Sequence, residues 1–241
     1  MLPDADLDMT AQGALWGVYM NAGQACESGS RLLVHEDIYD ALLEKLVERS
    51  ANIVLGDPMD PSTGMGPMTS ETHCQKVLGY IDSAKAEGGR VACGGGLATV
   101  QGCEGGFFVQ PTVLADMTND MKASREEIFG PVLVVIKYSS EEEAIAIAND
   151  SDYGLSAGVW TQDLVKAKQI SRELNAGSVW INDWHMMRTD APFGGFGQSG
   201  LGREFGKYSI DSYVETKTVS AAFETLPARK NLQRIVHTQM S

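Results

Sequence analysis

The sequence lacks any apolar run of the roughly 18 residues that a membrane-spanning helix needs. Its first six residues, Met1-Leu2-Pro3-Asp4-Ala5-Asp6, have neither the basic stretch nor the apolar run of a secretory signal. These absences predict no membrane partner and a cytoplasmic location.

Cysteine and histidine are scarce, with four of each in 241 residues. No two cysteines form a CxxC pair, and the histidines show neither HxxxH nor His-Cys spacing. The sequence therefore predicts no disulfide framework and no metal site. A reducing cytoplasm would keep the cysteines as thiols.

Positive charge is also in short supply, with 19 Lys and Arg against 32 Asp and Glu, for a net charge of −13. Phosphate backbones repel such a chain, so we expect no nucleic-acid partner. The hydrophobic share of 43% is ordinary for a globular protein.

Helix-like and strand-like segments alternate along the chain. Helical periodicity marks residues 7–20, 36–53, 70–87, 140–149 and 164–174. Strand-like segments are residues 31–34, 90–93, 107–114, 132–136, 155–161, 178–182 and 212–219. This alternation predicts an α/β fold with a mostly parallel sheet flanked by helices, and the continuous apolar run at 132–136 suits a strand buried on both faces.

A single cysteine, Cys26, ends the loop Asn21-Ala22-Gly23-Gln24-Ala25-Cys26 between a predicted helix and a predicted strand. A loop cysteine can be exposed, and its thiolate fraction is strongly nucleophilic. Burial in the core is the commoner fate of a lone cysteine, so the residue type alone leaves both interpretations open.

Two acidic residues open the segment Glu126-Glu127-Ile128-Phe129-Gly130-Pro131, just before the most apolar predicted strand. A carboxylate there could accept hydrogen bonds from ribose hydroxyls, and Phe129 could flank a planar heterocycle. The alternative is an ordinary loop with a solvated acid pair.

The run from Pro192 to Glu204 contains Gly195, Gly197 and Gly200 in GxGxxG spacing. We reject a dinucleotide fingerprint, because no strand directly precedes the run. The glycines instead suit a close passage of backbone along a site wall. The preceding segment 182–187 mixes polar and large apolar residues, as small-molecule pockets do, although His185 alone is more typical of a structural residue.

Together and in this order, these segments resemble the NAD(P)-dependent aldehyde dehydrogenases. The resemblance covers residues 2–219 and rests on four groups of residues: Gly23-Gln24-Ala25-Cys26 with Ser30-Arg31, Glu126 to Val132, Asn149-Asp150 with Tyr153-Gly154-Leu155, and Pro192 to Gly195 with Ser199-Gly200 and Gly202-Arg203-Glu204. It implies a three-layer α/β catalytic domain over residues 1–211 and an oligomerisation-type strand and tail over residues 212–241.

The resemblance also implies roles for individual residues. Cys26 matches the catalytic cysteine, which attacks an aldehyde to give a thiohemiacetal and then a thioester that water hydrolyses to the acid. Glu127 and Phe129 match the residues at the nicotinamide ribose and ring of the cofactor. The substrate tunnel would be lined by Asn182, Met187 and Phe193.

The family motif Glu-Leu-Gly-Gly-Lys, which holds the general-base glutamate, is absent from the sequence, as is the cofactor-binding domain. We therefore expect the catalytic-domain, C-terminal half of an enzyme that uses NAD or NADP at full length. This portion alone would bind no cofactor and be inactive. Glu27 and Gly197 also depart from the family, and an acid at position 27 would disfavour a thiolate at Cys26.

The expected partners are a small aldehyde and either further copies of the chain or the missing half. The alternative is a non-enzymatic interaction or oligomerisation module that retains the fold.

Overall fold

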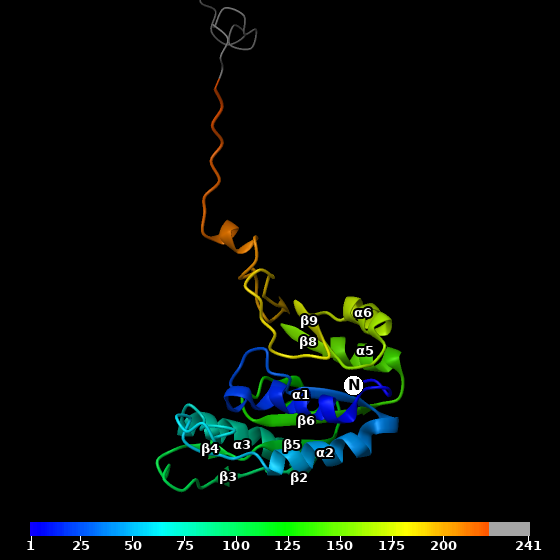
Figure 1. Ribbon diagram of the computed structural model, residues 1–241, viewed down its shortest axis with the longest axis vertical. Helices are drawn as coiled ribbons and strands as arrows, with labels where there is room; N and C mark the ends of the chain where they lie inside the picture. Colours follow the sequence, from blue (N-terminus) through cyan, green and yellow to red (C-terminus); the bar gives the residue numbers. More distant parts are fainter. Residues whose placement is uncertain (222–241) are drawn as a thin grey trace, which may run out of the picture. The chain divides into compact units, whose positions relative to one another are not determined.

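The computed structural model describes residues 1–221, in which residues 1–209 form one compact unit and a second unit begins at Ile210. A four-stranded sheet lies in the first unit, in the order β1-β6-β5-β2. Its strands are β1 (Arg31–His35), β6 (Val132–Tyr138), β5 (Thr112–Met117) and β2 (Arg90–Cys93). β6 runs parallel to β1 and β5, and β2 is antiparallel to β5, so the predicted mostly parallel sheet is confirmed (Figure 1).

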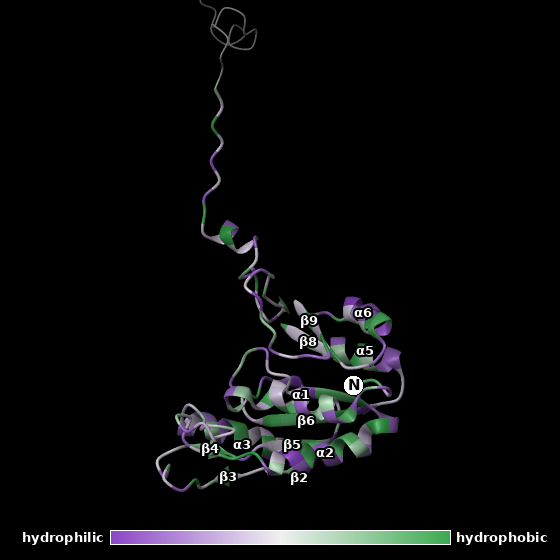
Figure 2. Cartoon of the chain, in the orientation of Figure 1, coloured by the Kyte–Doolittle hydropathy of each residue, from purple (hydrophilic) through white to green (hydrophobic). Residues whose placement is uncertain are grey.

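Strand β6 is an interior strand of the four-stranded sheet, and its apolar sequence suits burial on both faces. Residues 132–136 are all buried, and β5 and β6 are coloured as hydrophobic in Figure 2. A strand between two parallel neighbours has both edges hydrogen-bonded, so the apolar run is buried without leaving backbone groups unpaired.

Three longer helices pack around this sheet: α1 (Leu7–Tyr19), α2 (Tyr39–Ala51) and α3 (Glu71–Ala86). Asp6 caps α1 by accepting hydrogen bonds from the N–H groups of Asp8 and Met9, and Ser70 caps α3. α1 and α2 contact each other, while α3 contacts β2 and β5. This is the predicted arrangement of helices flanking a sheet.

A second parallel pair, β8 (Ser156–Val159) with β9 (Ser178–Ile181), is flanked by α5 (Glu141–Asn149) and α6 (Leu164–Glu173) (Figure 1). Smaller antiparallel pairs join β3 (Leu97–Ala98) to β4 (Phe108–Val109), and β7 (Tyr153–Gly154) to β10 (Phe196–Gly197). The short elements are η1 (Met20–Gly23), η2 (Glu36–Ile38), α4 (Lys122–Arg125) and η3 (Ser209–Ser212).

Two strand predictions need correction. The strand expected over 107–114 is two strands, β4 and β5, separated at Pro111, which has no N–H to donate to a ladder. The strand expected over 212–219 is not formed: η3 ends at Ser212, and residues 213–221 contain neither helix nor strand. An extended segment becomes a strand only when a neighbour pairs with its backbone, and within residues 1–221 none of the strands pairs with it. The rest of the predicted tail, from residue 222, lies outside the described residues.

None of the helices within residues 1–221 is long and apolar enough to cross a membrane.

Candidate active site

The loop that carries Cys26 leaves α1 through a strained turn. Asn21, Ala22 and Gly23 all have positive φ, at 53°, 57° and 71°. A Cβ at Gly23 would lie 2.1 Å from the carbonyl oxygen of Gly130, so only glycine lets the loop approach the segment before β6 this closely. The turn therefore brings together two motifs that are about 100 residues apart in the sequence.

The side chain of Gln24 fixes the same loop from the other side. Its Nε2 donates to the carbonyl of Asn21 at 3.0 Å, and its Oε1 accepts from the N–H of Thr69 at 2.8 Å. These bonds tie the cysteine loop to the segment that precedes α3.

Cys26 is an exposed free thiol, whereas Cys74 is buried. Its Sγ donates to Glu27 Oε2 at 3.3 Å. Partial burial raises the pKa of the Cys26 thiol, and the hydrogen bond to Glu27 and the charge of that carboxylate raise it further. The N–H groups of Cys26 and Glu27 lower the thiol pKa by a smaller amount. Burial and Glu27 thus both disfavour the Cys26 thiolate, and the effect of Glu27 has the direction expected from the sequence.

The Glu27 carboxylate itself is buried and tied to the segment after β9. His185 Nδ1 lies 3.0 Å from Glu27 Oε1, and Trp184 Nε1 donates to the Glu27 carbonyl at 2.9 Å. Burial raises the pKa of Glu27, but hydrogen bonds from its own N–H, Cys26 and His185 outweigh that effect and lower it. The result is a buried chain of contacts from Cys26 through Glu27 to His185.

His185 holds a left-handed backbone, φ 60°, and its side chain is 5% exposed. Its Nε2 atom is buried without a hydrogen-bond partner in the part of the chain that the structure describes. The sequence pointed to His185 as a structural residue, but gave no sign that it contacts Glu27. A lone histidine carries no spacing signal, and only the fold brings residues 27 and 185 together.

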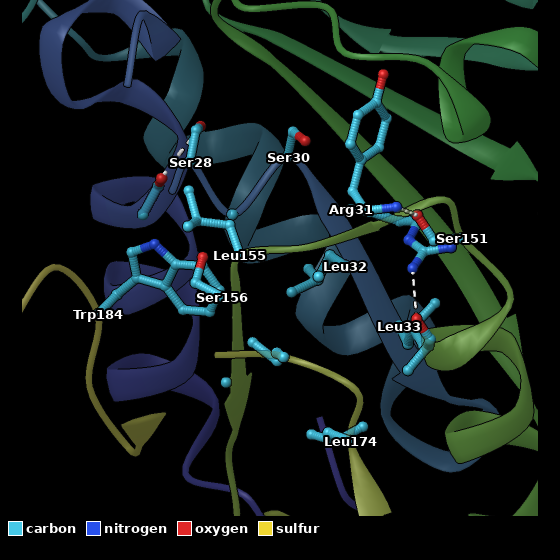
Figure 3. Close-up of a pocket in the computed structure, with 18 of the residues that line it drawn as sticks. Ser28, Ser30, Arg31, Leu32, Leu33, Ser151, Leu155, Ser156, Leu174 and Trp184 are labelled. Atoms are coloured by element: carbon cyan, nitrogen blue, oxygen red, sulfur yellow. Dashed lines mark hydrogen bonds between the residues drawn. The ribbon is translucent and has the colours of Figure 1, made fainter. Parts of the chain in front are cut away.

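A cavity of about 480 Å³ opens beside the cysteine loop. Cys26, Glu127 and Phe129 all line it, so the structure brings together three of the six predicted site residues. Figure 3 shows Arg31, Leu32 and Leu33 of β1 on one wall, and Ser156 of β8 with the preceding Leu155 on another.

The segment before β6 contributes two different groups to this cavity. Phe129 has φ 57°, and its carbonyl lies 2.6 Å from His73 Nε2, which anchors the residue to α3. Glu126 and Glu127 are both exposed, and Glu126 accepts a hydrogen bond from the Tyr80 hydroxyl at 2.9 Å. Both acids line the cavity, but Glu126 is held to α3 through Tyr80, whereas none of the hydrogen bonds found within residues 1–221 fixes the Glu127 side chain.

The other three predicted site residues do not line the cavity. The Asn182 side chain bonds the backbone of Thr161 in both directions, at 2.8 and 2.9 Å. Met187 is 48% exposed, and Phe193 pairs through its backbone with Glu204. Sequence resemblance grouped these residues with Cys26, whereas in this structure they lie on the separate segment that follows β9.

The glycine-rich run is used for close backbone contact, as its composition suggested. A Cβ at Gly177 would lie 1.6 Å from the carbonyl oxygen of Gly194, and β10 pairs with β7. Gln198 and Ser199 reach the cavity wall. No helix follows the run directly, as it would in a dinucleotide turn, within residues 1–221.

The described part of the chain, residues 1–221, contains no cluster of three or more His, Cys, Asp and Glu side chains that could hold a metal ion.

Comparison with known proteins fits this combination of an exposed loop cysteine and a neighbouring acid-aromatic segment. The model of the aldehyde dehydrogenase family matches residues 1–219. The chain belongs to the aldehyde dehydrogenase family. It is 47% identical over 216 residues to betaine aldehyde dehydrogenase from Brucella melitensis, covering 90% of this chain and 44% of that protein.

Solved structures of aldehyde dehydrogenases share the fold. An NAD+ complex of the Bacillus cereus enzyme superposes with a TM-score of 0.89 at 46% identity, over 93% of this chain and 45% of that one. Betaine aldehyde dehydrogenase from Staphylococcus aureus, in complex with NAD+ and carrying a mercaptoethanol-modified cysteine, gives 0.87 at 43% identity, over 89% of this chain and 44% of that one. The chain thus spans less than half the length of the relatives it matches.

Proposed function

We propose that this chain is the catalytic-domain, C-terminal half of an NAD(P)-dependent aldehyde dehydrogenase, and that Cys26 is its nucleophile. The observation that carries the proposal is that Cys26 is exposed at a cavity also lined by Glu127 and Phe129. The domain would comprise residues 1–211.

The reaction begins with attack of the Cys26 thiolate on the aldehyde carbon, which forms a C–S bond and leaves an oxyanion. The backbone N–H groups of Cys26 and Glu27 both lower the pKa of the thiol, and we propose them as the donors to that oxyanion. Loss of hydride from the thiohemiacetal gives a thioester, and water cleaves the C–S bond to release the acid.

NAD(P), when bound, supplies the hydride acceptor. Residues that line the cavity fit only the nicotinamide half of the cofactor. The exposed Glu127 carboxylate suits ribose hydroxyls, and the Phe129 ring suits a flat heterocycle. We infer that residues 1–211 alone bind the cofactor too weakly for turnover, and that they lack the general base that would activate the hydrolytic water.

Deprotonation of Cys26 needs help, because burial and Glu27 raise the pKa of the thiol. Glu27 is already hydrogen-bonded to His185. The base that deprotonates Cys26 therefore comes from another part of the full-length enzyme or forms when the substrate binds. This is a second reason to expect no turnover from this portion alone.

The relatives named for betaine aldehyde, and Trp184 on the cavity wall, make two substrate classes worth testing. A quaternary ammonium group can lie over an aromatic ring, and an apolar aldehyde can pack against the same ring. Cytoplasmic location follows from the need to keep Cys26 a thiol.

Competition between iodoacetamide and an aldehyde for the Cys26 thiol tests the assignment of the nucleophile without requiring turnover. Iodoacetamide should alkylate Cys26 faster than Cys93 or Cys103, and Cys74 slowest, as followed by peptide mass spectrometry. Betaine aldehyde or hexanal at millimolar concentration should slow the labelling of Cys26 alone, because a thiohemiacetal blocks it. Cys26→Ser supplies the matched control. Faster labelling of Cys103, or no protection by either aldehyde, would remove Cys26 from this role.

A non-enzymatic interaction module is the second candidate. It is favoured by the open cleft between β1 and β8, which continues the same cavity away from Cys26. Turnover on adding the missing half of the enzyme, measured as NADH absorbance, would decide for the enzyme; association without turnover would decide for the module.

A further inference from the structure

The segment that follows β9 holds the backbone of the cysteine loop through the indole ring of Trp184. A Cβ at Gly17, Gly29 or Gly158 would lie 3.1, 3.2 or 2.5 Å from this ring, so α1, the segment after Cys26 and β8 form a glycine-lined slot around it. The ring nitrogen donates to the carbonyl of Glu27 at 2.9 Å. The backbone of Glu27 is therefore fixed against the segment after β9.

The side chain of Glu27 is held separately, with one partner at each carboxylate oxygen. Oε2 accepts from Cys26 Sγ at 3.3 Å, and Oε1 lies 3.0 Å from His185 Nδ1. Both acid and imidazole are buried, with side chains that are 6% and 5% exposed. A buried carboxylate is costly unless it is hydrogen-bonded, so this one depends on both partners.

These contacts decide which nitrogen of His185 carries the hydrogen. Burial raises the pKa of Glu27, but its hydrogen bonds lower it on balance, so the carboxylate is ionised at neutral pH. An ionised carboxylate can only accept, and Nδ1 must therefore donate. Nε2 is buried without a hydrogen-bond partner within residues 1–221, where a second hydrogen would be an unpaired donor. Neutral His185 with its hydrogen on Nδ1 is the form that fits.

Aromatic rings keep the imidazole in this orientation. Trp16 of α1 and Trp184 both lie edge to face with it, with ring centroids 5.8 and 6.4 Å away. His185 also has φ 60°, in a region that histidine and asparagine adopt more readily than most residues. The ring thus directs one nitrogen at Glu27 and leaves the other without a bond to the described residues.

Few charged groups face this contact chain. A thiol, a carboxylate, an imidazole, an indole and a hydroxyl meet there, from the cysteine loop, the segment after β9, α1 and β8: Cys26, Glu27, His185, Trp16 and Ser156. The exposed carboxylate of Asp183 accepts from the N–H of Trp184 at 2.8 Å. Glu27 is therefore the charged group in direct contact with the thiol.

We propose that His185 is a positioning residue that holds the Glu27 carboxylate on the Cys26 thiol and so sets how readily this thiol reacts. The Nδ1 donor occupies Oε1 and leaves Oε2 for the thiol hydrogen. Without it, the buried carboxylate loses one of its two side-chain partners and turns away toward water. Cys26 then loses both an acceptor and a neighbouring negative charge, and forms its thiolate more easily. The inference rests on the proposed function for the role of Cys26.

Two substitutions of nearly equal size separate the hydrogen bond from the packing of the ring. His185→Asn places an amide N–H where Nδ1 lies, and His185→Leu has no donor. Iodoacetamide alkylation of Cys26 is followed by peptide mass spectrometry from pH 6 to pH 10, on the full chain and without aldehyde. His185→Leu should lower the pH midpoint and label about threefold faster at pH 7. His185→Asn should keep the profile of the unsubstituted chain.

A double-mutant cycle with Glu27→Gln distinguishes positioning from packing. In the Glu27→Gln chain, His185→Leu should cause no further change, because no carboxylate charge is left to hold. Strain from leucine at a positive φ would act in both chains and cancels in the cycle. An unchanged or higher midpoint in His185→Leu, the same shift in the Glu27→Gln chain, or a His185→Asn profile like that of His185→Leu would each overturn the proposal.

The unsubstituted chain provides a measurement that does not depend on how well the variants fold. Nitrogen NMR of the His185 ring at pH 8 should show a neutral imidazole with its hydrogen on Nδ1, and a hydrogen on Nε2 would overturn the proposal. Aldehyde protection of Cys26 tests the proposed function separately. Absence of protection with an intact cycle would contradict the nucleophile alone, and protection without coupling to His185 would contradict the positioning role alone.

Discussion

The four-stranded sheet and the β8–β9 pair differ in how completely their strands are buried. In β6, six of the seven residues are buried, whereas all four residues of β9 are only partly buried. β6 has strands on both edges, whereas within residues 1–221 β8 and β9 pair only with each other. The contrast shows that an apolar strand is buried by its neighbours as much as by its own sequence, since β9 contains Val179, Trp180 and Ile181.

The cysteine loop connects these two regions. Gly23 lies against Gly130, just before β6, whereas Glu27 is bonded to Trp184 and His185, just after β9. Ser156 of β8 also donates to the Glu27 carbonyl, at 3.2 Å. The position of Cys26 therefore depends on both sheets.

Truncating one side chain in each sheet should give the largest difference in the free energy of unfolding. Leu133→Ala in β6 removes a side chain with no exposure, and should lower the free energy of unfolding by about 2–5 kcal/mol. Val179→Ala in β9, where the side chain is half-buried, should cost about 1 kcal/mol or less. Urea unfolding of both variants measures this, and equal losses would mean that the two sheets are equally well packed.

The next largest loss of stability is expected from disrupting the contact between the cysteine loop and the four-stranded sheet. Gly23→Ala places a Cβ against backbone at a positive φ, and should cost about 2–3 kcal/mol and slow alkylation of Cys26. Gly79→Ala is the matched control, because it lies in α3 with nothing within 4 Å of the new Cβ. That variant should be more stable by up to about 1 kcal/mol. Thermal unfolding would refute the interpretation if Gly23→Ala matched the parent.

Acetylating the terminal amine should change how stability depends on pH, because the Met1 amine lies where the two sheets approach each other. The amine pKa falls from 8.0 to about 5 on folding, so the unfolded chain binds more protons between these values and stability rises with pH. This contribution is complete above pH 8 and is lost as pH falls through about 5. We expect the free energy of unfolding to differ by about 1–2 kcal/mol between these pH values. This is less than the full pKa change would give, because Met1 as a residue is only half-buried.

The acetylated chain has no such group, so its unfolding free energy should change less over the same interval. Chemical denaturation at pH 5 and pH 8 supplies the measurement. Identical pH dependence with and without the acetyl group would place the amine in water.

Replacing the acid beside the cysteine should have the smallest effect. Glu27→Gln removes a charge that raises the pKa of the Cys26 thiol, but leaves the larger effect of burial. Iodoacetamide labelling at pH 7 should become a few times faster, and its pH midpoint should move down. Glu142→Gln, on the exposed face of α5, controls for the change in net charge. Slower labelling of Glu27→Gln would instead show that the carboxylate assists the thiol.

Local sequence patterns predicted much of this structure because they act at short range. The apolar run of β6 and the caps at Asp6, Ser70 and Ser140 set where elements begin, so most helices were predicted within a few residues. The predicted strand at 212–219 failed because a strand requires a partner, which periodicity does not reveal.

By itself, the sequence determined the α/β class, the family and the identity of the candidate nucleophile, since each depends on residue types in order along the chain. Only the tertiary structure decided that Glu127 and Phe129 join Cys26 at one cavity while Asn182, Met187 and Phe193 do not. It alone linked Glu27 to His185. The physical reason is that burial and hydrogen bonding join residues more than 100 positions apart, and no local pattern encodes such a pairing.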